Sequence, residues 1–278
     1  THIRVLELMK ENQNNPELER KGMYTTGILA VKGDQQIALF FTGRQTAGEN
    51  LDDVLQRRAE ELDAIMHMAD GSAASRTKEV ETLESNCLTH GRRKFVEIYE
   101  AFPEACQKVI DDLADVYQVD AFAKARQLTD EERLKLRQTW SKPIIDNLEV
   151  WLHQQLDDRI VEPNSSLGKA IKYCLKRWTE MTRFLVFPGA VLDNNPCERT
   201  LKAPILNRKN AMFYKTLHGA LIGDILMSVI DTCYLAGENA FDYLLQLQYH
   251  RADVLKNPDD WLPWTYRQSL WQREGKQA

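Results

Sequence analysis

The sequence predicts a mixed α/β protein in which a sheet-containing domain is interrupted by a large all-helical insertion. Short β-branched and aromatic runs bounded by turn residues lie within residues 1–90 and are typical of strands. Helical spacing without a strand pattern fills residues 91–187, and mixed signals return after residue 188. At roughly 150 residues per domain, 278 residues make one large domain or two modest ones.

Composition places the chain among ordinary globular proteins. Hydrophobic residues make up 43% and charged residues 28%, which excludes a disordered, a collagen-like or a disulfide-rich chain. The longest apolar runs, such as Ile37–Phe41, fall far short of the roughly 20 residues of a membrane helix. We therefore expect no membrane span, and we find no pattern of a secretory leader.

Cysteine usage favours a reduced, cytoplasmic protein, and the net charge bears on nucleic-acid binding. The five cysteines are scattered and none forms a C-x-x-C pair. Cys87 and His90 form a C-x-x-H pair, but no second half with zinc spacing follows, so zinc is a minor alternative. The net charge of −5 argues against wholesale coating of nucleic acid and still allows a local basic groove.

The first 90 residues form an α/β layer in this interpretation. Two strands flank a turn at Lys32–Gln35, whose Gly and Asp suit a hairpin. Apolar residues at helical spacing predict a helix after them, and a short apolar segment that stops at an acid predicts a buried strand. The predicted elements are the end of a strand at 1–6, strands at 23–31 and 36–42, a helix at 50–62, and strands at 64–69 and 84–90.

The rest of the chain divides into three parts. An insertion of about four helices is predicted over 91–187. The second part of the sheet domain is expected over 188–236, where a basic loop precedes an apolar helix from about 219 to 236. Residues 237–278 form an aromatic tail with Trp261, Trp264 and Trp271, which we expect to wrap around the domain.

Asp70 is the first candidate site residue. It ends the apolar segment and is followed by Gly71 and Ser72, small residues that let a ligand approach. An acid at the end of a buried strand is well placed to bind a hard cation such as Mg²⁺ through oxygen. The alternative is a turn aspartate that accepts hydrogen bonds from its own backbone, and spacing alone favours that alternative.

Glu198 is the second candidate site residue. Asn195 suits an N-cap and Pro196 the first helical position, so Glu198 closes a variant of the capping box in one interpretation. In the other, Glu198 faces a metal from the first turn of a helix, with Arg199 and Lys202 beside it. The spacing does not decide between them.

A basic run follows Glu198, although the chain is acidic overall. Residues 199–223 contain five cations and no acid, with Phe213 and Tyr214 among them. Cations beside aromatic residues suit a phosphate backbone and splayed bases, whereas the alternative is a solvated loop neutralised by acids elsewhere. The candidate DNA-binding residues are Arg199, Lys202, Arg208, Lys209 and Lys215, with Arg92 and Arg93 as a second cluster.

Several motifs of other enzyme classes are missing from the sequence. We find no Walker A motif, no G-x-G-x-x-G, no nucleophile elbow and no H-E-x-x-H. This disfavours the P-loop, Rossmann, serine-hydrolase and zincin classes.

Two blocks of the sequence resemble the signature of transposases of the insertion sequence 66 family. The first is D-N-N-x-x-E-R at 193–199, followed by N-R-K-N at 207–210 and by Phe213. The second is C-x-x-H-x-R-R-K-F at 87–95. The segment Gly43-Arg44-Gln45 and the closing W-L-P-W at 261–264 also fit. The likeness covers nearly the whole chain, and the first block is specific.

The resemblance implies a ribonuclease-H-like mixed sheet with a helical insertion, and a D-D-E triad that holds two Mg²⁺ ions. Carried over by position, the second acid is Asp70 and the third is Glu198. Their carboxylates should converge to roughly 4–8 Å, the reach of two shared metals. The supporting residues are Asp193, Asn194, Asn195 and His90.

The resemblance places the first acid just before Thr1, because residues 1–5 match the segment that follows it. We therefore expect DNA strand cleavage and transfer to belong to a longer parent, and this chain by itself to be inactive. One alternative is a non-catalytic remnant that binds DNA or a transposase partner. Another is a metal-dependent nuclease or phosphatase of the same fold.

The same resemblance implies the partners and the location. DNA is expected as the partner, both as insertion-sequence ends and as target, and a homo-oligomer is compatible with the family. A bacterial cytoplasmic protein is implied, associated with the nucleoid when bound to DNA and not with a membrane.

Overall fold

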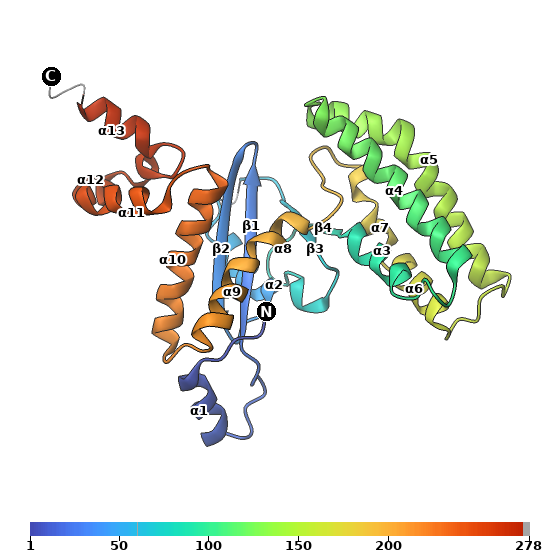
Figure 1. Cartoon of the computed structure of the whole chain (residues 1–278), viewed down its shortest axis with the longest axis horizontal. Coiled ribbons are helices and arrows are strands. Elements are labelled where there is room, and N and C mark those ends of the chain that lie inside the picture. The colour runs from blue at the N-terminus through green and yellow to red at the C-terminus, as the bar shows by residue number, and fades with distance from the viewer. Residues whose placement is uncertain (60, 275–278) are drawn as a thin grey trace. The chain divides into compact units, whose positions relative to one another are not determined.

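The computed structural model describes residues 1–59 and 61–274 and contains two compact units. The hairpin unit comprises Thr1–Val54 and Asn195–Ala278, and the helical unit comprises Leu55–Asn194. The chain therefore leaves the hairpin unit once and returns to it (Figure 1). The compact units divide at residues 54 and 194, and the last two strands belong to the helical unit.

The hairpin unit is built around two long antiparallel strands. Strand β1 (Tyr24–Lys32) pairs with β2 (Gln35–Gly43), and the pairing runs from Tyr24 opposite Gly43 to Lys32 opposite Gln35. Both predicted strands are confirmed. The segment before them makes only isolated bridges, at His2 and Val5, because α1 (Leu6–Asn14) begins directly afterwards. The helix predicted over 50–62 is α2 (Ala47–Leu55), which starts earlier and ends earlier.

Helix α10 (Leu217–Leu235) covers the outer edge of β2 and takes the place of a third strand. An edge strand leaves every second N–H group without a strand partner. Four residues of helix advance about 6 Å, nearly the same as two residues of strand, so polar side chains four apart on α10 meet alternate N–H groups of β2. The bonds run from Thr42 N to Asp224 Oδ2 at 2.5 Å, Phe40 N to Ser228 Oγ at 2.9 Å and Ala38 N to Thr232 Oγ1 at 3.1 Å.

The basic segment of the hairpin unit is helical, so the predicted loop is wrong. Helix α8 (Asn195–Thr200) contacts β1, and α9 (Lys202–Ala211) follows at once. Pro204 lies in the first turn of α9, where its missing N–H costs no helical hydrogen bond. A strand residue without a side chain, Gly27, lets Leu201 approach β1, because an added Cβ would lie 2.7 Å from that leucine.

The C-terminal tail packs on the end of α10 instead of wrapping around the domain. Trp261 is buried with Tyr243 and Tyr266 in a small cluster against the last turns of α10. Trp271 remains exposed, so the expectation for that tryptophan was wrong. The tail elements are α11 (Ala240–Tyr249), α12 (Arg251–Lys256), a 3-10 turn at Pro258–Trp261 and α13 (Tyr266–Glu274).

The helical unit begins with two short parallel strands. Strand β3 (Met66–Ala69) pairs with β4 (Leu83–Asn86), with Met66 opposite Leu83. The strand predicted over 84–90 is therefore wrong in its second half, because α3 (Leu88–Val96) starts two residues after Asn86. Within the described residues the strands form two separate two-stranded sheets, not the single mixed sheet that was expected. A mixed α/β class is confirmed, and the ribonuclease-H-like topology remains a prediction.

Helices make up the rest of the helical unit. Residues 100–185, all of which are described, contain no strand, as predicted. The buried core lies between the two long helices, the shorter helices and the segment that returns toward residue 194. The helices are α4 (Pro103–Ala125), α5 (Asp130–Asp157), α6 (Ser166–Leu175) and α7 (Trp178–Met181), followed by a 3-10 turn at Arg183–Leu185.

A buried ion pair joins the two long helices. Arg137 of α5 is 1% exposed and pairs with Asp120 of α4. The same guanidinium donates to the carbonyl oxygen of Ala190 at 2.6 Å and to that of Phe184 at 3.5 Å. A buried guanidinium with these partners satisfies its charge and several of its donors. Arg137 therefore ties both helices to the returning segment at 184–190.

No single helix among the described residues is long and apolar enough to cross a membrane. Taken together, α10 and α11 pass the same test of length and composition, but the chain bends by 117° between them.

We predict that Asp224 makes the stability of the chain depend on pH. Burial raises the pKa of this carboxyl above 3.8, and the hydrogen bonds from Thr42 only partly oppose that rise. Its contribution to folding is complete below the unfolded pKa and is lost as pH rises through the folded pKa. An Asp224→Asn variant should lack this loss. The free energy of unfolding of the variant, minus that of the parent, should therefore increase as pH rises.

Urea denaturation of both proteins at a series of pH values above 3.8 measures this difference. A difference that stays constant with pH would show that the carboxyl titrates alike in both states.

We predict that Arg137→Met destabilises the helical unit by about 3 kcal/mol, because it leaves the buried Asp120 without its main partner. Lys142→Met is the matched control on the same helix. Lys142 forms an exposed ion pair with Asp146, and exposed pairs contribute less than about 1 kcal/mol. Chemical denaturation of both variants provides the test, and equal losses would contradict the proposed importance of the buried pair.

Candidate functional site

Asp70 lies where the two parallel strands of the helical unit end. Because β3 and β4 are parallel, their carboxyl ends lie at the same edge, with Asp70 directly after Ala69 and Cys87 directly after Asn86. Carboxylate oxygen Oδ1 of Asp70 accepts from the Ser72 backbone N–H at 2.9 Å and from the Ser75 hydroxyl at 3.1 Å. The turn aspartate considered as the alternative is therefore present in the structure. That turn also fixes the carboxylate at the strand edge.

The turn after Asp70 requires glycine. Gly71 has φ of +77°, a conformation that favours glycine, and a side chain there would press on Arg177 and Asn86. Arg177 donates to the Gly71 carbonyl oxygen at 3.3 Å, and the Tyr173 hydroxyl donates to the Asp70 carbonyl oxygen at 3.2 Å. The backbone around Asp70 is thus held from α6 and from the residue that precedes α7.

The electrostatics of Asp70 favour its charged form. Burial alone would raise the pKa of this carboxyl, but hydrogen bonds from Ser72 and Ser75 and the charge of His90 outweigh burial and lower the pKa below 3.8. A half-buried carboxylate that stays ionised at neutral pH is the chemical form that binds Mg²⁺. The residue fits the role of one magnesium ligand.

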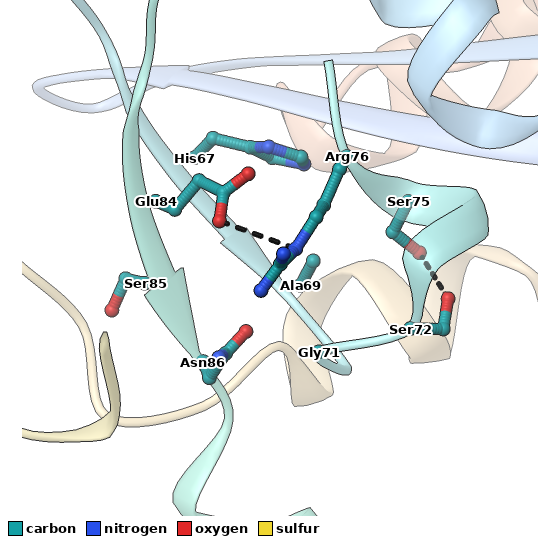
Figure 2. A pocket seen from close by; sticks show the side chains of 9 residues that line it. All are labelled: His67, Ala69, Gly71, Ser72, Ser75, Arg76, Glu84, Ser85 and Asn86. Carbon is teal, nitrogen blue, oxygen red and sulfur yellow. Dashed lines mark hydrogen bonds and ion pairs between the residues drawn. The ribbon is translucent and has the colours of Figure 1, made fainter. Parts of the chain in front are cut away.

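A small pocket, drawn in Figure 2, is lined by Ala69 and Gly71, the residues on either side of Asp70 in the sequence. The Arg76 guanidinium points into it and pairs with Glu84 of β4, with 3.4 Å between Nε and Oε2. At its base lies Asn86, which is 5% exposed, and no protein atom among the described residues accepts from its Nδ2 group. The pocket is lined by His67, Ala69, Gly71, Ser72, Ser75, Arg76, Glu84, Ser85 and Asn86.

Three of the predicted supporting residues lie in the same unit as Asp70. His90 is in the first turn of α3, and a positive charge on its ring lowers the pKa of Asp70. Asp193 and Asn194 end the unit in a returning loop, which is held where the Leu88 N–H donates to the Leu192 carbonyl oxygen at 3.0 Å. The fourth supporting residue, Asn195, is the first residue of α8 in the hairpin unit.

The zinc alternative at Cys87 and His90 gains no support from the structure. Burial raises the pKa of the Cys87 thiol, so the thiolate that binds zinc is disfavoured. Across residues 1–59 and 61–274, no three His, Cys, Asp or Glu side chains are grouped so that they could hold a metal ion.

Glu198 lies in the first turn of α8, as its sequence context predicts. It is half-buried, and the helix is anchored by Cys197, whose thiol donates to the Gly27 carbonyl oxygen of β1 at 3.6 Å. Asp70 and Glu198 belong to different compact units. Their convergence on shared metals therefore stays a prediction.

The five cations of the basic run at 199–223 have different surroundings. Arg208 is half-buried and donates to the Thr1 hydroxyl and to the His2 carbonyl oxygen, each at 2.6 Å, so it helps to hold the N-terminal segment. The other four cations of the run lie on or just after the two short helices α8 and α9: Arg199, Lys202, Lys209 and Lys215. The second cluster lies on α3 of the helical unit, where Arg92 is half-buried and Arg93 is exposed.

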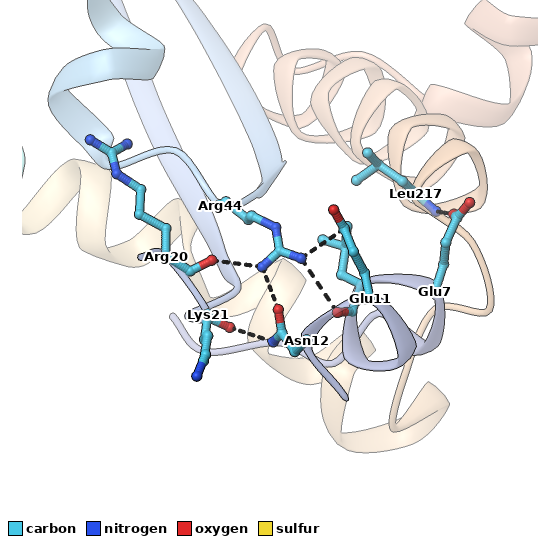
Figure 3. Close-up of polar contacts among 8 residues, drawn as sticks. Glu7, Glu11, Asn12, Arg20, Lys21, Arg44 and Leu217 are labelled. Atoms are coloured by element: carbon cyan, nitrogen blue, oxygen red, sulfur yellow. Dashed lines mark hydrogen bonds and ion pairs between the residues drawn. The ribbon is translucent and has the colours of Figure 1, made fainter. Parts of the chain in front are cut away.

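Arg44, in the segment after β2 that supports the family resemblance, has a structural environment. Its guanidinium donates to Asn12 Oδ1 and to the Arg20 carbonyl oxygen, both at 2.7 Å, and to Glu11 Oε2 at 2.8 Å (Figure 3). A planar guanidinium can direct several donors at once. Arg44 therefore fastens α1 and the following loop to the end of β2.

Sequence reasoning missed two groups that shape the candidate site. Ser75 completes the hydrogen bonding of Asp70, and Tyr117 of α4 reaches Thr89 and Asp193. Serines shortly after an acid were a usable signal for the first group. The sequence contains no signal for the contact of Tyr117 with Asp193. Tyr117 lies 76 positions before Asp193 and looks like any helical core residue.

Comparison with known proteins identifies the chain's relatives. The family model described as Transposase IS66 family matches residues 1–221, a range that includes Asp70 and Glu198. An uncharacterized protein of Sinorhizobium fredii (strain NBRC 101917 / NGR234), y4jD, is 32% identical over 186 residues, which cover 65% of this chain and 35% of the relative. A second from the same organism, y4hP, is 28% identical over 211 residues, which cover 71% of this chain and 38% of the relative.

The chain spans only about a third of the length of these curated relatives. No solved structure matches it significantly.

Proposed function

Because this chain belongs to the IS66 family of transposases, we propose that it is the part of a transposase that cleaves and transfers DNA strands with Mg²⁺. The observation that carries the proposal is the position of Asp70, an ionised carboxylate held at the edge where two parallel strands end. The family match also includes Glu198 on the first turn of its helix. The chain spans about a third of the length of its curated relatives, so the proposed activity is that of a protein of their length.

Asp70 and Glu198 are the proposed metal ligands. Two magnesium ions, when bound, activate the attacking water or 3′-hydroxyl and stabilise the leaving oxygen of an in-line phosphoryl transfer. Asp70 supplies a carboxylate whose position is fixed by Ser72 and Ser75 and whose charge is favoured at neutral pH. Glu198 supplies a second carboxylate from a short helix anchored on β1 through Cys197. The family resemblance implies a third acid beside these two, so the proposed chemistry requires all three carboxylates.

The remaining cations of the hairpin unit are the proposed contacts to DNA phosphates. Lys202, Lys209 and Lys215 lie on or just after α9, and Arg199 lies on α8 next to Glu198 in sequence. Phosphate contacts by Lys and Arg position a protein on DNA without reading its sequence. Arg208 is left out of this set because its guanidinium is bonded to the N-terminal segment.

We predict metal-dependent cleavage of terminal-repeat DNA by a protein in which this chain is extended to the length of its relatives. Asp70→Asn and Glu198→Gln should each lower the rate at least about a hundredfold, because each removes a charge that holds the metals. Glu17→Gln, at an acid of the hairpin unit outside the proposed site, is the matched control and should leave the rate unchanged. A gel-based cleavage assay with Mg²⁺ compares the four proteins and the unextended chain.

Equal activity of the extended protein and its Glu198→Gln variant would refute the assigned role of Glu198. DNA binding without metal-dependent cleavage in every form would favour the non-catalytic alternative.

We predict that binding to duplex DNA weakens with salt through these cations. The triple variant Lys202→Gln, Lys209→Gln and Lys215→Gln should reduce the slope of log affinity against log salt by up to about 0.9 for each lost phosphate contact. Lys256→Gln, at an exposed cation of α12, serves as the control. Fluorescence anisotropy over a salt series measures both slopes, and an unchanged slope in the triple variant would exclude this surface as the DNA contact.

A further inference from the structure

The returning loop at 190–194 is held by the helical unit at several separate points. The Ala190 carbonyl oxygen accepts from the buried Arg137 of α5 at 2.6 Å. The Leu192 carbonyl oxygen accepts from the Leu88 N–H of α3 at 3.0 Å, and the Asn194 N–H approaches the Cys87 sulfur. These contacts fix the backbone of a loop that carries the first two residues of the D-N-N-x-x-E-R block.

The side chain of Asp193 is held by a tyrosine from the long helix α4. Tyr117 hydrogen-bonds to Asp193, and its hydroxyl lies 2.8 Å from the Thr89 hydroxyl of α3. A carboxylate accepts hydrogen bonds and does not donate them. The Tyr117 O–H therefore donates to Asp193, and the Thr89 hydroxyl donates to the phenolic oxygen of Tyr117.

The environment of Tyr117 keeps this donor protonated. Burial raises the pKa of the Tyr117 hydroxyl far above its ordinary value of 10.0, and the nearby charge of Asp193 raises it further, while the bond from Thr89 opposes the rise only in part. A hydrogen bond from a buried neutral donor to a carboxylate is stronger than a bond between two neutral groups. Asp193 thus has a protonated hydrogen-bond donor on α4 of the helical unit.

We infer that Tyr117 is a positioning residue of the proposed catalytic site, which fixes Asp193 and with it the loop that leads directly into the helix of Glu198. The inference rests on the proposed function. Loop residue Asn194 is the last of the helical unit, and Asn195 begins α8. The helical insertion then has a defined role, because it sets the conformation of the chain at its entry to the Glu198 helix.

The first arm of the test uses this chain and needs no catalysis. The carboxyl ¹³C resonance of Asp193, assigned by its disappearance in Asp193→Asn, is compared between the parent and Tyr117→Phe. Loss of the phenolic donor should shift that resonance and should increase amide exchange at Asn194 about tenfold, the typical effect of one hydrogen bond to a charged group. Tyr99→Phe is the matched control, because the Tyr99 hydroxyl bonds to Gln107 on the exposed surface at 2.6 Å.

The second arm measures cleavage in the extended protein. Tyr117→Phe should lower kcat about tenfold with KM for DNA unchanged. Asp193→Ala, which leaves no acceptor for the phenol, should have a similar effect, and the double variant should be no slower than either single variant, because both remove the same interaction. Thermal unfolding shows whether each variant is folded.

The two arms separate this inference from the proposed function. An unshifted Asp193 resonance in folded Tyr117→Phe, or additive effects in the double variant, would overturn the positioning role. If the extended parent does not cleave DNA at all, the proposed function fails. The resonance and exchange measurements still decide whether Tyr117 holds the loop.

Discussion

The constraint on which the structure depends is the need to satisfy backbone polar groups around two sheets that have only two strands each. A two-stranded hairpin is marginal by itself in water. In the hairpin unit, α10 carries polar side chains four residues apart. Asp224, Ser228 and Thr232 accept hydrogen bonds from the N–H groups along the edge of β2. In the helical unit the short parallel strands end in polar turns, and the returning loop bonds to the start of α3. Elements distant in sequence are tied together by these bonds.

In the candidate site, too, the same hydrogen bonds satisfy the backbone and position a functional side chain. The turn that satisfies the end of β3 is the turn that fixes Asp70, and its hydrogen bonds both hold the carboxylate and favour its charge. The guanidinium that joins the two long helices also holds Ala190, a few residues before Asp193. Structural and functional interpretations of these residues are therefore compatible. A residue that terminates a strand in a fixed direction is well suited to bind a metal.

Sequence reasoning worked where one local pattern dominated. The hairpin strands, the apolar helix α10 and the helical character of the insertion follow from period and turn chemistry, and Glu198 was placed on the first turn of a helix by its Asn-Pro context. It failed where tertiary contacts decided. His90 was assigned to the end of a strand over 84–90, yet that strand ends at Asn86 and α3 begins at Leu88. The basic run was assigned to a loop because it is polar, yet helices form there and use Arg208 to hold the N-terminal segment. No local signal revealed Tyr117 as the partner of Asp193.

The central claim is that Asp70 and Glu198 bind shared metal ions. The most direct measurement is paramagnetic broadening of carboxyl ¹³C resonances by Mn²⁺, which takes oxygen ligands as Mg²⁺ does, in the protein extended to the length of its relatives. If the two acids share metal ions, the resonances of Asp70 and Glu198 broaden together at the same Mn²⁺ concentration, while that of Glu17, outside the proposed site, stays sharp. Broadening of one acid without the other, or of neither, would contradict this claim.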